Sequence, residues 1–211
     1  MNALSNSIEQ LYSAFAAEAP GIAGCPCCIT ESELRQLEDT PLREVTPELL
    51  APYAAAALLT VGSKEDYLYF LPRILEISIY DENWWPDIEV TGRAVAETQV
   101  SSWPANRVSA LTDFLLISIK YLIDEREYRR IDGWMCAIGR MDLDVGSMLA
   151  LIEKDREAVL EFWRANAGKL FKGELGNAFW ERRNHQYDQI VEWFNTPNVK
   201  AISRSAYGYR T

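Results

Sequence analysis

Histidine and basic residues are scarce in this sequence, and each shortage argues against a class of function. The 211 residues include one histidine, His185, and 21 lysines and arginines against 31 acidic residues, a formal net charge of −10. A hydrolytic triad would need His185, but no G-x-S-x-G nucleophile motif and no glycine-rich phosphate loop is present. Phosphate backbones and anionic lipids repel so acidic a chain. We therefore expect no catalytic residues, no nucleic-acid partner and no membrane partner.

Long apolar runs are also missing. No stretch approaches the roughly 18–20 uninterrupted apolar residues of a membrane span. The N-terminal stretch lacks the basic region of a signal peptide and carries Glu9 and Glu18. Three of the four cysteines are clustered, and the fourth is Cys136, so they do not form the spaced framework of a small secreted domain. These features favour a cytoplasmic protein with reduced thiols.

What the chain does have is apolar residues at helical spacing, within a composition that is 48% hydrophobic. Strand-like alternation is nowhere sustained. The pattern predicts an all-α protein, a single compact domain over 1–211 built from stacked antiparallel helices. Residues 1–80 carry the motifs described below, and 81–211 form a helical remainder. Helices are expected near 8–15, after 30, and at 46–62, 64–80 (divided at Pro72), 105–122, 128–139, 144–153, 155–167 and 177–194, with a basic C-terminal segment that is either a loose tail or packed on the body.

The stretch "GIAGCPCCIT" at 21–30 brings Cys25, Cys27 and Cys28 within four positions. Cys25 and Cys28 have the C-x-x-C spacing of a zinc knuckle, but the sequence has no second cysteine pair. Only Cys136 and His185 remain as further ligands, so metal binding is an alternative and no cofactor is expected.

Two other interpretations of these thiols stay open. A position just before a helix N-terminus would lower a thiol pKa and suit redox chemistry. Alternatively, Gly24 and Pro26 form a turn whose cysteines are buried as small apolar side chains. Thr30 followed by Glu33 predicts a capping box directly after the turn.

The segment "DENWWPDIE" at 81–89 combines acidic and aromatic residues without a basic one. Aromatic rings surrounded by carboxylates suit an interface with a basic partner. The alternative is that one tryptophan fills the core and the acids lie on a solvated helix turn. The predicted partner-binding residues are Asp81, Glu82, Trp84, Trp85, Asp87 and Glu89.

Residues 21–77 resemble a family of uncharacterised bacterial proteins. The shared features are the G-C-P-C-C turn, the short helix after it, the "PLREVTPELLAPYAAAALLTVG" segment and the "FLPR" motif. Some such proteins resemble immunity proteins encoded beside secreted toxins, so the resemblance implies a toxin domain as partner but no activity. The turn also resembles a zinc-ribbon-like C-P-C-C family, from which this chain departs by lacking a second cysteine pair.

Taken together, these features predict a binding protein, not an enzyme, that neutralises a basic partner. The most specific form of this hypothesis is an immunity protein that blocks a bacterial toxin domain by steric occlusion. The alternatives are a zinc- or thiol-dependent regulatory protein that uses Cys25 and Cys28, and a helical adaptor in a larger assembly.

Overall fold

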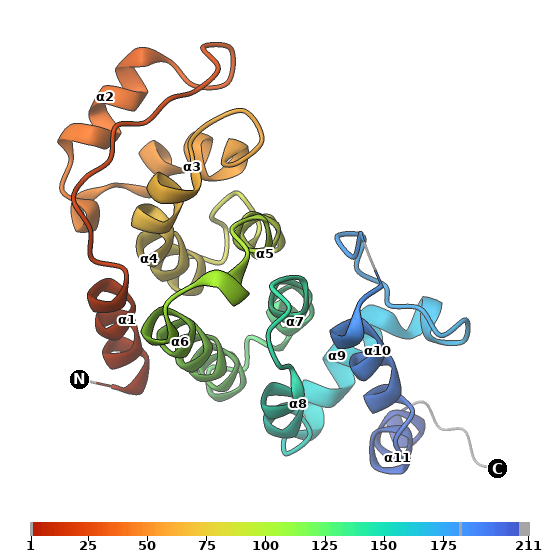
Figure 1. The fold of residues 1–211 in the computed structure, drawn as a ribbon. Helices are drawn as coiled ribbons and strands as arrows, with labels where there is room; N and C mark the ends of the chain where they lie inside the picture. The colour runs from red at the N-terminus through yellow and green to blue at the C-terminus, as the bar shows by residue number, and fades with distance from the viewer. Residues whose placement is uncertain (1, 182, 207–211) are drawn as a thin grey trace. The chain divides into compact units, whose positions relative to one another are not determined.

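The computed structural model describes residues 2–181 and 183–206, and these ranges are predominantly helical (Figure 1). They contain eleven α-helices and three short 3-10 helices. No β-strand occurs in the described ranges, where extended pairing is limited to isolated bridges from Val61 to Gly24 and to Ala57. The predicted all-α class is confirmed.

The chain divides into two compact units, which we call unit 1 (Met1–Phe114) and unit 2 (Leu115–Thr211). The boundary falls within helix α6 (Ala105–Asp124). None of the helices in the described ranges is long and apolar enough to cross a membrane.

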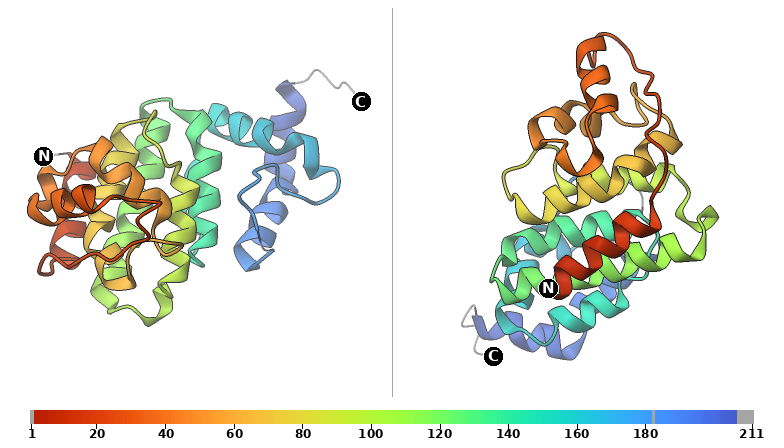
Figure 2. Two further views of the ribbon diagram at one scale, coloured as in Figure 1. Left: turned by 90° about the horizontal axis from the view of Figure 1, so that it is seen from above. Right: turned by 90° about the vertical axis from the view of Figure 1, so that its left-hand side faces the viewer.

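Unit 1 is built around α4 (Lys64–Tyr80), which buries Leu71, Ile74 and Leu75 completely. Helices α1 and α3 pack on α4, and α3 also packs on α2 and α5. Helix α1 lies beside the first turns of α6 (Figures 1 and 2), where Arg107 donates to the Ala14 carbonyl at 3.2 Å. The other helices of the unit are α1 (Ala3–Ala14), α2 (Glu31–Asp39), α3 (Pro47–Ala56) and α5 (Ile88–Glu97).

The start of α2 has the predicted capping chemistry. Thr30 and Glu33 form the capping box of α2, and Ser63 with Asp66 forms another at the start of α4. Two expectations about helix ends were wrong. Helix α3 stops at Ala56 and is followed by a turn, and α4 continues through Pro72. A proline removes one helical hydrogen bond, and here the burial of the surrounding apolar side chains outweighs that loss.

Unit 2 contains α7 (Ile131–Arg140), α8 (Gly146–Ile152), α9 (Arg156–Leu170), α10 (His185–Phe194) and α11 (Pro197–Ala206). Helix α9 packs against α7, α8 and α11. The first three helices match the expected ranges closely.

Helix α10 starts later than expected, and the C-terminal segment, expected as a loose tail or packed on the body, forms a packed helix. Helix α10 begins at His185 instead of 177, because the Asn184 side chain accepts from the Tyr187 amide at 2.9 Å and so caps the helix there. The basic C-terminal segment forms α11, which packs on α9, and its last five residues, 207–211, lie outside the described ranges.

Candidate functional site

The acidic aromatic segment forms the loop between α4 and α5, and the structure assigns its two tryptophans opposite roles. The Trp84 side chain is 8% exposed, and its indole N–H donates to the Pro47 carbonyl at 3.2 Å. The Trp85 side chain is 60% exposed. Trp84 therefore fixes the loop on the start of α3, and Trp85 is presented to solvent.

The four acids of this segment also separate. Glu82 and Asp87 are exposed, Asp81 is half-buried and accepts from the Asn83 amide at 3.0 Å, and Glu89 is buried. Asp87 occupies the N-cap position of α5, yet its side chain makes no capping hydrogen bond. Its carboxylate is thus exposed to solvent. We call residues 81–87 the Trp85 loop; its exposed residues are Glu82, Asn83, Trp85 and Asp87.

The net negative charge of the protein comes from unit 1. That unit contains 17 acidic and 6 basic residues, a formal net charge of −11, whereas unit 2 contains 14 acidic and 15 basic residues, or +1. Each basic side chain of unit 1 already donates a hydrogen bond within the unit. Carboxylates accept from Arg35, Arg43 and Arg73, backbone carbonyls accept from Arg93 and Arg107, and a serine hydroxyl accepts from Lys64. The uncompensated carboxylates make this unit a strongly negative surface.

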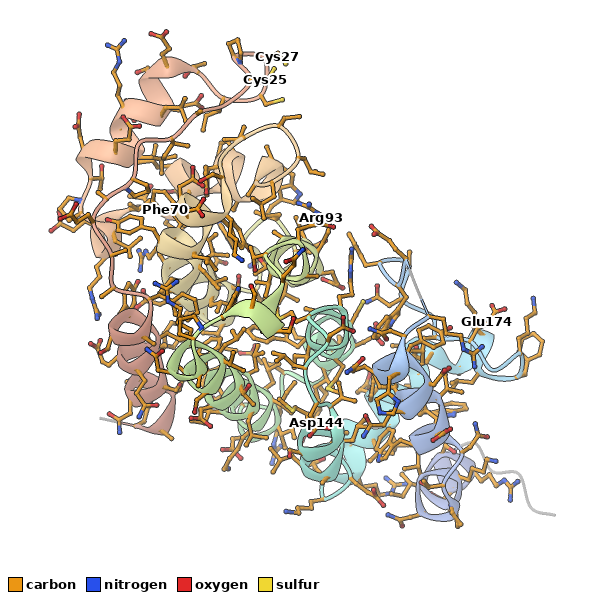
Figure 3. The ribbon with its side chains drawn as sticks, in the orientation of Figure 1. Cys25, Cys27, Phe70, Arg93, Asp144 and Glu174 are labelled. Carbon is orange, nitrogen blue, oxygen red and sulfur yellow. The ribbon has the colours of Figure 1, made fainter. Side chains whose placement is uncertain are left out.

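The cysteine turn, residues 25–28, is attached to the loop that follows α3. The Cys25 amide donates to the Thr60 carbonyl at 2.9 Å, and the Gly62 amide donates to the Ala23 carbonyl at 2.7 Å. A Cβ atom on Gly24 would lie 3.0 Å from the Ile29 side chain and 3.1 Å from that of Val61, so a larger residue there would require these side chains to shift. Figure 3 shows Cys25 and Cys27 together on the loop before α2.

The thiols of this turn are accessible, which corrects one expectation. Cys27 and Cys28 are exposed and Cys25 is partly so; the interpretation as buried small apolar side chains was wrong. The sulfur atoms of Cys25 and Cys27 lie 2.8 Å apart, and those of Cys27 and Cys28 lie 3.7 Å apart. Contact with Cys27 lowers the pKa of Cys25, and contact with Cys25 and Cys28 raises the pKa of Cys27 to about 11.

The two remaining ligand candidates lie elsewhere. Cys136 is buried in α7 of unit 2, and His185 is exposed at the start of α10. Across the described ranges, three or more potential ligands gather only at Cys25, Cys27 and Cys28. The geometry adds Cys27, which the C-x-x-C spacing did not select.

Sequence reasoning also missed two exposed apolar side chains beside these features. Tyr80, the last residue of α4, is 52% exposed next to the Trp85 loop. Leu59 is 66% exposed in the turn whose Thr60 carbonyl binds the Cys25 amide. Each lies in a segment whose apolar spacing predicts a helix with buried apolar residues, so the exposure of these two side chains is visible only in the folded structure.

Comparison with known proteins adds no assignment to this geometry. No protein-family model, curated protein or solved structure matches the chain.

Proposed function

We propose that this chain is a binding protein that captures a basic protein partner through the Trp85 loop. The observation that carries the proposal is the 60% exposure of Trp85 between two exposed carboxylates, Glu82 and Asp87, in the unit that holds the negative charge. Across the described residues, neither carboxylate takes part in an ion pair within 4.0 Å.

The exposed indole supplies the binding energy in this proposal. Tryptophan is among the residues that contribute most when they are buried at the centre of an interface. The loop that carries Trp85 is held by the hydrogen bond from Trp84 to Pro47, so less conformational entropy is lost on binding. The partner is expected to provide an apolar pocket for this ring.

The carboxylates supply the selectivity and the speed of association. Lysine or arginine side chains around the partner's pocket would pair with Glu82 and Asp87, and the field of unit 1 would steer the encounter. Because exposed charges are screened over about 10 Å at 0.1 M salt, the association rate should fall as salt rises. The family resemblance suggests a toxin domain as the partner, which binding would neutralise by covering its active cleft.

The test compares three forms of the immobilised full chain: the wild type, Trp85→Ala, and a double reversal of Glu82 and Asp87 to Lys. Basic proteins retained by the wild type and lost from Trp85→Ala are identified by mass spectrometry. The most enriched one is then produced alone for calorimetry and stopped-flow measurements. We expect Trp85→Ala to weaken its affinity by about 30-fold or more, as for an interface residue worth about 2 kcal/mol.

A matched charge control uses unit 2. Reversing Glu125 and Glu192, which are both exposed, to Lys changes the net charge by the same amount as the loop reversal. We expect the loop reversal to slow association far more than this control. If Trp85→Ala binds like the wild type, or the unit 2 reversal has the larger effect, the Trp85 loop is not the interface. Relief of partner-induced growth arrest by the wild type, but not by Trp85→Ala, tests the toxin assignment.

A further inference from the structure

The three thiols of the cysteine turn form a compact ligand set on one side of the chain. Their sulfur atoms all lie within 4.8 Å of one another. A metal with bonds of about 2.3 Å to tetrahedrally arranged thiolates requires sulfur atoms about 3.8 Å apart. The separation of 3.7 Å between Cys27 and Cys28 already meets this requirement. Cys25 and Cys27, at 2.8 Å, need to separate by about 1 Å, which a side-chain rotation at the exposed Cys27 can supply.

The backbone beneath the thiols is fixed from both sides. The amides of Cys28 and Ile29 donate to the Cys25 carbonyl at 2.9 and 3.2 Å and close the turn, while the Cys25 amide is bound by Thr60. The Ile29 side chain is 2% exposed, and the chain passes directly into the capping box of α2. The backbone that carries the ligands is thus held in place without a metal, so metal binding requires little ordering of the chain.

We propose that Cys25, Cys27 and Cys28 bind one thiophilic cation, Zn²⁺ or Cu⁺, through three thiolates. Soft thiolate ligands select these ions, and calcium and magnesium prefer oxygen ligands. Where the cation is zinc, a water or an incoming group occupies the fourth position, since the described residues bring no further histidine, cysteine or carboxylate into the cluster. The net charge of −11 on unit 1 favours the approach of a cation.

Metal binding at this site should depend on pH, because the ligands are thiolates and binding releases protons. The apparent affinity should therefore rise steadily with pH through neutrality. If the cysteine turn had only a structural role, no metal affinity that rises with pH would be measured.

The experiment uses the full chain, reduced and freed of metal under anaerobic conditions. Zn²⁺ and Cu⁺ are titrated separately against a chromophoric competitor, with Cys25→Ser, Cys27→Ser and Cys28→Ser beside the wild type. We expect one ion per chain. Loss of an outer-shell partner typically costs 10–100-fold in affinity, so loss of a ligand should cost about 100-fold or more. Cys136→Ala is the matched control, because it removes a buried thiol outside the cluster, and it should bind like the wild type.

Each outcome decides the proposal. Stoichiometric binding of either ion that all three serine variants weaken supports it, and the arm that binds identifies the cation. The proposal is overturned if neither ion binds, if a variant with Cys25, Cys27 and Cys28 all replaced by serine still binds the ion, or if Cys136→Ala abolishes ion binding. Circular dichroism of each variant shows that the fold is kept, as expected for exposed and partly exposed side chains.

Discussion

The adjacent tryptophans provide a sharp test of the structure, because one residue should matter for stability and the next for binding. Trp84→Ala removes a large ring that is 8% exposed, which should cost about 3–5 kcal/mol of unfolding free energy. Trp85→Ala removes a ring that is 60% exposed, and surface substitutions of this kind stay within about 0.5 kcal/mol. Urea unfolding followed by far-ultraviolet circular dichroism measures both. With a slope of about 3 kcal/mol per molar urea, Trp84→Ala should lower the midpoint by about 1–2 M.

A third variant separates packing from hydrogen bonding. Trp84→Phe keeps most of the buried ring but leaves the Pro47 carbonyl without its indole donor, so a loss of about 1–3 kcal/mol is expected. The order of stability should be wild type and Trp85→Ala together, then Trp84→Phe, then Trp84→Ala. Equal destabilisation by the two alanine variants, or a neutral Trp84→Ala, would refute the assignment of the buried and exposed rings.

Two further predictions concern packing and pH. A Cβ atom on Gly139 would lie 2.2 Å from the Trp180 ring, so Gly139→Ala should lower the unfolding free energy by about 1–3 kcal/mol. The control is Gly168→Ala, because a Cβ atom on Gly168 would meet no atom within 4 Å. In thermal or urea unfolding, this control should raise the unfolding free energy by about 0.5–1 kcal/mol. Burial raises the pKa of Asp66 above 3.8, so the folded chain binds this proton more tightly than the unfolded chain. The wild type should therefore gain stability relative to Asp66→Asn as the pH falls from neutrality towards about 3.8 in a urea series, and a constant difference would contradict the burial of this carboxyl.

Local chemistry made several helix starts predictable, and tertiary contacts decided the features that sequence patterns missed. The capping boxes at Thr30 and Ser63 depend on residues three positions apart, so they are visible in the sequence. The continuity of α4 through Pro72 depends on the packing of its buried face, which no local rule contains. The C-terminal helix α11 was missed for the same reason, since its contact with α9 lies far away in the sequence.

The sequence predicted which segments form the candidate sites, but not which of their side chains are exposed or close together. Sequence composition identified the loop with two adjacent tryptophans, but the burial of one of them depends on Pro47, 37 positions away. The same limit applies to the cysteines. The C-x-x-C spacing selected Cys25 and Cys28, whereas the turn brings the sulfur atom of Cys27 to 2.8 Å from that of Cys25. Glu89 belongs to the acidic segment by sequence, yet α5 buries its side chain, so reversing it to Lys would test folding instead of binding.

Helix α3 connects the two proposed sites, and its packing implies that they act independently. Trp84 is bound at its first residue, and the Cys25 amide is bound by Thr60 in the turn after its end. Coupling between two sites requires an element with two alternative arrangements that both sites bias. Helix α3 packs on α2, α4 and α5, and its Leu50 and Tyr53 side chains are 0% exposed. Such close packing holds the helix in a single arrangement. Partner affinity should thus be the same with and without metal at the cysteine turn, and Trp85→Ala should not change metal affinity. A shift in either measurement would show that α3 moves when one of the sites is filled.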